Sequence, residues 1–304
     1  MLKRIRNNSD INRFFRNLLK KCIRIFTSLT YRWPVSGTIE LEFRNKKIVY
    51  FARCDDGIVD TFFYERNYIE FPELNLFSHI AEHSKTIVDI GANTGLYSII
   101  SSLFNPQANI LAFEPGKANL ERLQKNISLN KLENIQAIGQ AIGDSVTTIS
   151  FTVPDNGMIS DTCSALGDFS RSMYEGNINW IDVEVPQTTL NEFSKKAGRV
   201  DLMKIDVEGY EINVFKGATD FFKKHSPVIL CEIFLDGEKQ AYFEDFLKTN
   251  QYYAYQVLKE GLLRLDEGLA PNYDGLNFLF SRNKTAHVFT SFKHMEQLVA
   301  ELMG

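Results

Sequence analysis

The sequence predicts an α/β protein built on a mostly parallel, doubly wound sheet. An apolar run that begins at Thr86 contains the acid Asp89, and a glycine turn and apolar residues at helical spacing follow it. A second apolar run, Asn109–Phe113, ends directly at Glu114 and Pro115. Strands that alternate with helices in this way are typical of βαβ units, whose crossover helices cover both faces of a parallel sheet.

The turn after the first strand indicates what kind of ligand to expect. Gly91 and Gly95 are present, but Asn93 and Leu96 stand where the dinucleotide fingerprint G-x-G-x-x-G has its second and third glycines. Those glycines let the backbone close on a pyrophosphate, so we expect a ligand that lacks one. A nucleoside with an amino-acid tail, S-adenosylmethionine (SAM), suits this looser turn. Glu114 lies roughly 20 residues further on, where an acid binds ribose hydroxyls.

The remaining pattern continues the alternation of strands and helices. The expected strands of the sheet lie at 86–90, 110–113, 135–141, 200–205 and 227–233. The expected helices between them lie at 96–104, 118–130 and from 211 to 217. Before this core we expect a hairpin at 37–51 and a mainly helical stretch at 56–84 that is interrupted at Phe71 and Pro72. Within it we expect additional strands at 147–153 and 183–185 and a short helix that starts at Thr188 or Thr189. After it we expect two strands within 252–280 and a closing helix at 286–303. The polar stretch 154–181 is long for a loop in a compact domain, and such loops are usually functional or disordered.

Residues 1–36 differ in character from the rest of the chain. Apolar residues from Ile11 to Phe26 recur at helical spacing. Many lysines and arginines lie among them, and Asp10 is the one acidic residue of the segment. Charged residues such as Lys20 interrupt the apolar core that a signal peptide needs. Two interpretations stay open: the helix packs on its own domain or on a sister subunit, or it lies on an anionic membrane surface.

Composition excludes several classes of protein. The 304 residues are 44% hydrophobic, which is ample for a core, and the net charge of −4 gives no case for nucleic acid. The four cysteines lack a C-x-x-C spacing, so we expect reduced thiols in a cytoplasmic protein, with the membrane's inner face as the alternative location if the basic helix binds lipid. No apolar run reaches the roughly 18 residues of a spanning helix.

Four motifs carry a resemblance to a known family. They are Val88-Asp-Ile-Gly-Ala-Asn-Thr-Gly95, Phe113-Glu-Pro115, Ala141-Ile-Gly-Asp144 and Leu202-Met-Lys-Ile-Asp-Val-Glu-Gly-Tyr-Glu211. The last motif is similar to a segment L-K-I-D-V-E-G-x-E, with Met203 as a departure. Residues 57–281 thus resemble the FkbM-type SAM-dependent methyltransferases.

That resemblance implies a class I methyltransferase fold, Rossmann-like and doubly wound, with seven strands of which the last is antiparallel. The domain would span 85–285, after a hairpin and helical lead-in at 37–84 and before a C-terminal helix at 286–304. The cofactor-binding residues that it implies are Asp89, Gly91, Ala92, Asn93, Gly95, Glu114, Pro115, Ala141 and Asp144. Asp89 and the turn would surround the methionine part of SAM, Glu114 would hold the ribose, and Ala141 and Asp144 would lie near the adenine.

The chemistry of methyl transfer points to a further set of acids. A hydroxyl is a poor nucleophile until its proton leaves, so a base or a metal helps. Ligands in open α/β sheets lie beyond the carboxyl ends of the strands, where Asp206, Glu208 and Glu232 fall. Asp206 is the first candidate for a general base or an acceptor-orienting group, although it also suits a structural role or the SAM amino group. Glu208 also suits a helix N-terminus. A divalent metal such as Mg²⁺ stays open, with no ligand assigned.

Several functions remain as alternatives at this stage. The family resemblance implies O-methylation of a sugar, a glycan or a natural product, and a non-sugar small molecule or a lipid is the alternative acceptor. A non-catalytic SAM-binding scaffold would lack reason to keep Asp89, Glu114 and Asp206. An NAD-linked oxidoreductase would need the missing glycines and a catalytic Tyr-x-x-x-Lys or a histidine–acid pair, which we do not find.

Overall fold

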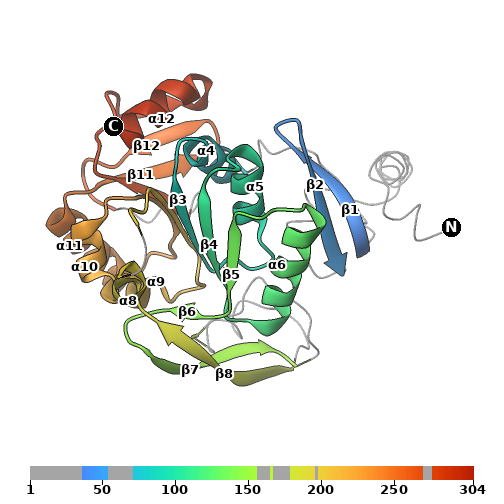
Figure 1. Ribbon diagram of the computed structural model, residues 1–304. Coiled ribbons are helices and arrows are strands. Elements are labelled where there is room, and N and C mark those ends of the chain that lie inside the picture. The colour runs from blue at the N-terminus through green and yellow to red at the C-terminus, as the bar shows by residue number, and fades with distance from the viewer. Residues whose placement is uncertain (1–35, 54–70, 156–164, 167–178, 196–197, 270–275) are drawn as a thin grey trace, which may run out of the picture.

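The computed structural model describes residues 36–53, 71–155, 165–166, 179–195, 198–269 and 276–304 (Figure 1). The predicted basic helix, most of the helical lead-in and most of the loop after 154 therefore lie outside the described residues. Within the described ranges, no helix is both long enough and apolar enough to cross a membrane.

A central sheet of nine strands organises the described part of the chain, in the order β14-β12-β11-β13-β10-β9-β3-β4-β5. Five of these strands are parallel to their neighbours: β3 (Thr86–Ile90), β4 (Asn109–Phe113), β5 (Ile135–Ile138), β9 (Leu202–Ile205) and β10 (Val228–Glu232). Next come β13 (Asn277–Ser281), antiparallel to β10, and β11 (Tyr253–Leu258). From β5 to β11 the sheet has the predicted seven strands, and β13, the last of these seven along the chain, is antiparallel to both of its neighbours. This confirms the predicted fold class.

Two further strands extend the edge of this sheet beyond the prediction. These strands are β12 (Gly261–Arg264) and β14 (Phe289–Ser291), both in antiparallel pairs. The region 252–280 thus holds three strands rather than two. The closing helix α12 (Met295–Met303) begins later than predicted, because β14 and a 3₁₀ turn (Phe292–His294) occupy the first part of that segment.

Helices cover both faces of the sheet, as Figure 1 shows. On one face lie α4 (Pro72–Ala81), α5 (Leu96–Phe104), α6 (Lys117–Leu129) and α12. On the other lie α8 (Leu190–Ser194), α9 (Glu211–Lys216), α10 (Thr219–Lys224) and α11 (Gly237–Asn250). Strand side chains alternate between the faces, so Ile87 packs under α4 while Val88 and Ile90 pack toward α9 and α10.

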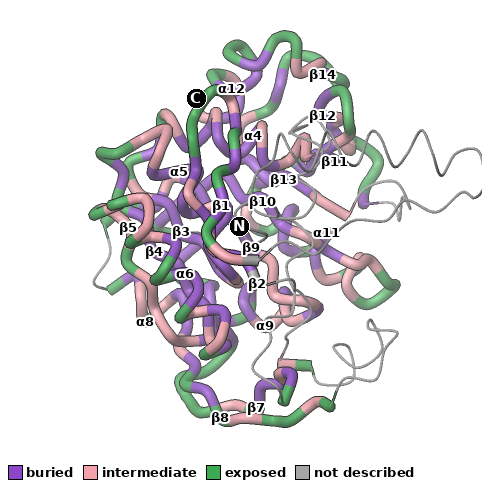
Figure 2. Tube along the Cα trace, turned by 90° about the vertical axis from the view of Figure 1, so that its right-hand side faces the viewer, coloured by how far each residue is buried: buried purple, intermediate pink, exposed green. Residues whose placement is uncertain are grey.

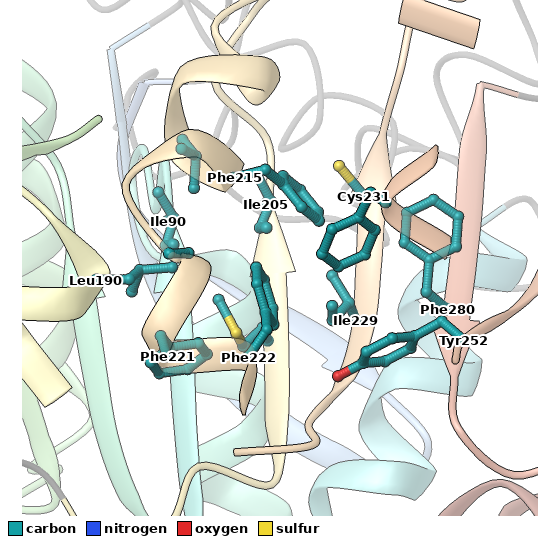
Figure 3. Close-up of a cluster of buried hydrophobic side chains, with 14 of the residues drawn as sticks. Ile90, Leu190, Ile205, Phe215, Phe221, Phe222, Ile229, Cys231, Tyr252 and Phe280 are labelled. Carbon is teal, nitrogen blue, oxygen red and sulfur yellow. The ribbon is translucent and has the colours of Figure 1, made fainter. Parts of the chain in front are cut away.

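The second face holds an aromatic core. Figure 3 shows Phe215 and Phe222 of the helical layer close to Ile205 and Ile229 of the strands. The rings of Phe215 and Phe222 stack with centroids 5.3 Å apart. Figure 2 shows that burial is concentrated in β3, β4 and β9, whereas the β7–β8 ribbon at the periphery carries many exposed positions. The rigid centre of the sheet is therefore the part that positions the strand ends.

The predicted hairpin is confirmed as β1 (Ser36–Phe43) and β2 (Lys46–Arg53). The two turn residues, Arg44 and Asn45, both have positive φ, as in the type I′ turns that commonly join two antiparallel strands. Side-chain amides of α6 satisfy the outer edge of β2: the Phe51 and Val49 backbone amides donate to Asn126 and Asn130 over 2.9 and 2.8 Å. The Tyr50 hydroxyl hydrogen-bonds Thr94 Oγ1 at 2.5 Å, which ties the hairpin to the glycine turn.

Two further expectations need correction. The strand expected at 135–141 ends at Ile138, because β6 (Ala141–Ile142) joins a second sheet with β7 (Thr147–Pro154) and β8 (Trp180–Thr188). Strand β8 is longer than the three residues expected. Pro72 begins α4, since the first helical position needs no N–H partner, and the part of the predicted helical stretch before residue 71 lies outside the described residues. The cap expected for α8 is confirmed at Thr189, which accepts from the Glu192 amide.

Candidate active site

A cavity of about 290 Å³ opens at the carboxyl ends of β3, β4, β9 and β10. The sequence-predicted residues that line it are Asp89, Gly91, Ala92, Asn93, Glu114, Pro115, Ala141, Asp206, Glu208 and Glu232. The fold thus brings together residues that are up to 143 positions apart (Asp89 and Glu232). The described residues lining the cavity do not include Gly95 or Asp144.

Gly91 is required by a close backbone approach. Its φ is +80°, and a Cβ placed there would lie 1.7 Å from the carbonyl oxygen of Asp206. The amides of Gly91 and Ala92 donate to the Phe113 carbonyl over 3.0 and 2.9 Å. The turn is therefore clamped between the ends of β4 and β9. Gly95 has a φ of +95° and is the N-cap residue of α5.

Glu114 is buried at the end of β4 and is held by backbone donors. The Asn93 amide donates to Oε2 over 2.9 Å, and the Gly116 amide donates to Oε1 over 2.7 Å. Burial raises the pKa of Glu114 to about 7 against the lowering effect of these hydrogen bonds. Each carboxylate oxygen can accept a second hydrogen bond, so the group can also bind hydroxyls.

Asp89 lies on the sheet face that α5 covers. Ser98 Oγ of that helix donates to Asp89 Oδ2 over 2.6 Å. Burial raises the pKa of Asp89 to about 6, opposed by the Ser98 hydrogen bond and by Lys204. A carboxylate that is desolvated and lies in a cavity can stabilise a cationic ligand strongly.

Lys204 is a residue to which the sequence analysis gave no role. Strand alternation places it on the same face as Asp89, its partner in the β3–β9 register. The side chain is 2% exposed, and its Nζ lies 3.2 Å from Asp206 Oδ2. Burial lowers the pKa of Lys204, but Asp206 and Glu232 outweigh it, so that the pKa rises to about 12. A lysine inside an otherwise apolar strand was the available signal.

Two more residues complete this cluster without having been predicted. Tyr97 of α5 lines the cavity, and its ring centroid is 5.2 Å from Lys204 Nζ. Glu73, in the first turn of α4, is close enough for Lys204 to lower its pKa, although burial raises that pKa overall. No motif connected Glu73 to the site, because α4 reaches it through the packing of α4 on the sheet.

The turn after β9 has two consecutive residues in the left-handed region and contributes a backbone donor to Glu211. Glu208 and Gly209 have φ of +52° and +97°. The Gly209 amide donates to Glu211 Oε1 over 2.8 Å, and Lys239 lies 3.2 Å from Glu211 Oε2. Glu211 is thus a buried structural carboxylate, whereas Glu208 lines the cavity.

Asp144 lies apart from the lining residues. It is exposed, and its carboxylate accepts from Ser145 Oγ and Asn213 Nδ2 over 2.9 and 3.3 Å. Its place near adenine therefore stays a prediction. In the described part of the chain, no group of three or more histidine, cysteine or acidic side chains is arranged to hold a metal ion.

The strand order and the acid at the end of β4 define a protein of the class I methyltransferase fold. The sequence matches the family described as "Methyltransferase FkbM domain" over residues 89–257, more than half of the chain. The chain therefore belongs to the FkbM methyltransferase family.

The chain is also similar to individual proteins. The chain is 31% identical over 156 residues to "Methyltransferase sdnD" of Sordaria araneosa, covering 44% of this chain and 60% of that protein. It is 27% identical over 160 residues to "Hexuronic acid methyltransferase AglP" of Haloferax volcanii, covering 52% and 59%. These matches span less than two thirds of either relative. The crystal structure of methyltransferase FkbM from Methylobacillus flagellatus KT is similar with a TM-score of 0.44 and 15% identity, covering 65% of this chain and 43% of that one.

Proposed function

We propose that this protein is a SAM-dependent O-methyltransferase that acts on a hydroxyl of a sugar or glycan. The observation that carries the proposal is the pairing of Asp89 and Glu114 around the Gly91 turn in one cavity, with Asp206 and Glu232 at the neighbouring strand ends. The family assignment supports methyl transfer as the reaction.

The residues present fit SAM. The turn at Gly91 offers backbone close to the cavity, Glu114 can accept from ribose hydroxyls, and Asp89 places a carboxylate where a cationic amino-acid tail needs one. SAM supplies a methyl group that is already activated by its positive sulfur. The remaining work of the chain is to bind the acceptor, align its oxygen and remove its proton. Alignment alone contributes several kcal/mol.

The choice of a sugar acceptor rests on two supports. One is the relative named as a hexuronic acid methyltransferase, and the other is the sugar acceptor that the family resemblance of the sequence implies. A natural product or a lipid with a free hydroxyl is the alternative acceptor. A cytoplasmic site of action, at the membrane's inner face if the basic segment 1–36 binds lipid, belongs to the same proposal.

Calorimetry and a turnover assay test this function. We expect the protein to bind SAM and not NAD, and to transfer tritium from methyl-labelled SAM to a mixture of methyl glycosides of neutral and acidic hexoses. Mass spectrometry of glycans and lipids from cells with and without the gene would then locate the methyl group. NAD binding in place of SAM would indicate an oxidoreductase, and SAM binding without any methyl transfer would indicate a scaffold.

A further inference from the structure

The carboxylates that line the cavity differ in how they are held. Glu114 accepts two backbone amides, Asp89 accepts Ser98 Oγ, and Asp206 pairs with the Lys204 ammonium. Among the described residues, none donates a hydrogen bond to the carboxylate of Glu232. Glu232 nevertheless lines the cavity and is only partly exposed. It is a desolvated carboxylate whose hydrogen-bonding capacity is left for a ligand.

Its position follows from the register of the sheet. Cys231 of β10 is paired with Ile205 of β9, so the next residues along the two parallel strands are Glu232 and Asp206. Asp206 lies two residues after Lys204, and Glu232 lies two residues after Leu230, the residue that is paired with Lys204. Because side chains two residues apart along a strand point to the same face, Asp206 and Glu232 lie on the face that carries Lys204. Three ionisable side chains are therefore neighbours across two strand ends, and the single ammonium is in contact with Asp206.

The Lys204 ammonium already occupies an oxygen of Asp206, whereas the described residues donate no hydrogen bond to the carboxylate of Glu232. A carboxylate that already accepts from a buried ammonium would have to give up that interaction when it is protonated. Lys204 is 2% exposed and needs a negative partner at all times, because an uncompensated buried charge is strongly unfavourable. Protonating Glu232 leaves this pair intact.

We propose that Glu232 is the catalytic residue that accepts the proton of the acceptor hydroxyl, and that Lys204 and Asp206 act as positioning residues for it. This inference rests on the proposed methyltransferase function and reverses the order of candidates that the sequence favoured. It assigns the acceptor oxygen to the part of the cavity next to the ends of β9 and β10.

The step balances with the groups named. The acceptor's O–H bond breaks and its proton passes to a carboxylate oxygen of Glu232. The acceptor oxygen forms a bond to the methyl carbon of the sulfonium donor, while the carbon–sulfur bond breaks and its electron pair stays on the sulfur. The products are a methyl ether, a neutral thioether and a protonated Glu232, which then returns the proton to water.

The surroundings of Glu232 adjust its basicity. Burial raises its pKa to about 7, with further raising by Asp206 and lowering by Lys204. The charged or titratable groups around it are Lys204 of β9, Asp206 directly after β9, Cys231 of β10, Glu73 of α4, Tyr97 of α5 and Glu211 of α9. A general base is most effective when its pKa lies near the working pH. Turnover should therefore fall as the pH drops below about 7.

The first test compares Glu232→Gln with Asp206→Asn and with the control Glu192→Gln, an exposed carboxylate on α8. With labelled SAM and the mixture of methyl glycosides, we expect Glu232→Gln to lose about 100-fold or more of turnover while SAM affinity stays within about twofold. Asp206→Asn should lose less, Glu232→Asp should retain part of the activity, and the control should match the wild type. Equal or greater loss in Asp206→Asn would overturn the proposal.

A second readout needs no acceptor. We expect infrared difference spectra of the protein with S-adenosylhomocysteine bound to show a carboxyl signal near pH 7 that is weaker in Glu232→Gln than in the wild type, because only the contribution of Glu114 remains in the variant. An equal signal in the two proteins would overturn the assignment of Glu232. Melting temperatures of each variant show whether it is folded. Failure of the proposed function is a separate result, because it would appear as a lack of SAM binding in the wild type.

Discussion

The two halves of the cavity hold the same kind of side chain in opposite ways. At the ends of β3 and β4, Asp89 and Glu114 accept hydrogen bonds from a serine and from backbone amides within the same βαβ unit. At the ends of β9 and β10, Asp206 and Glu232 depend on one buried lysine, and Glu232 receives no donor among the described residues. This difference underlies the proposed roles, in which the first half binds the cofactor and the second half exchanges a proton with the acceptor.

The comparison teaches that burial alone does not assign a role to a carboxylate. Burial raises the pKa of Glu114 and the pKa of Glu232 to about 7. Glu114 has fixed donors that keep its geometry the same in either state, which suits ribose hydroxyls. Glu232 has a free acceptor capacity, which suits a proton. The donors around each group, rather than its pKa, distinguish them.

The largest effect is expected from Gly91→Ala, which would break the join between the two halves. The added methyl group would meet the Asp206 carbonyl oxygen at 1.7 Å, with φ at +80°. We expect a loss of roughly 3–5 kcal/mol of folding free energy together with SAM binding. Chemical denaturation and calorimetry would measure both. Gly237→Ala is the matched control, since nothing lies within 4 Å of its Cβ, and it should be near neutral. A stable, SAM-binding Gly91→Ala protein would contradict the clamped turn.

Lys204→Met would sharpen the description of the second half. It leaves Asp206 and Glu232 without their ammonium, and the cost should be about 2–3 kcal/mol, less than for a fully buried pair because Asp206 is 31% exposed. We expect the loss of stability to shrink at pH 5, because Glu232, whose pKa is raised to about 7, is then protonated. Urea denaturation at pH 5 and pH 8 would show this difference. A loss that is the same at both values would argue for packing alone.

Glu114→Gln would test the first half. The Asn93 and Gly116 amides each donate to one oxygen of Glu114, and a glutamine offers only one oxygen. The side-chain NH₂ group would therefore face one of these backbone N–H groups without an acceptor between them. We expect SAM affinity to fall by about 1–3 kcal/mol, or roughly 5- to 150-fold. Calorimetric titration would check this value, with Glu121→Gln on the exposed side of α6 as the control. Unchanged SAM affinity would remove Glu114 from the ribose site.

A pH series would separate the halves further. The pKa values of Asp89 and Glu114 in the folded protein are raised, to about 6 and about 7, so the contribution of these groups to stability is complete below their usual values of 3.8 and 4.5 and is lost as the pH rises through about 7. Cationic SAM favours the ionised forms. We therefore expect SAM affinity to rise about tenfold from pH 6 to pH 8, and the gap between melting temperatures with and without SAM to widen. An affinity independent of pH would contradict ionisation on binding.

The smallest effect is expected from Ser98→Ala. It removes the hydroxyl that donates to Asp89 over 2.6 Å and leaves a small apolar residue under the helix. We expect SAM affinity to fall by about 1 kcal/mol, because the pKa of Asp89 would rise further. Ser101→Ala on the same helix, whose hydroxyl bonds only the Tyr97 carbonyl among the described contacts, is the control. Identical affinities for the two variants would show that Ser98 does not act through Asp89.

Much of the fold was predictable because its signals are local. The strand Thr86–Ile90 and the helix Leu96–Phe104 match their predicted bounds, and the strand Asn109–Phe113 begins one residue before its predicted start, since each has a clear apolar pattern and a clear stop. The edge strands β12 and β14 were missed because short strands gain their stability from pairing rather than from their own pattern. Glu73 and Lys204 were missed for the same reason, since only packing brings α4 over β9.

The sequence by itself determined the βαβ unit, its glycine turn and the acid at the end of the second strand, because these contacts join residues within a few turns of one another. It also determined which acids fall at strand ends. Tertiary structure alone decided which of those acids carry a partner. That outcome depends on the register between β9 and β10 and on the face that each side chain occupies, and these follow from the packing of the whole sheet.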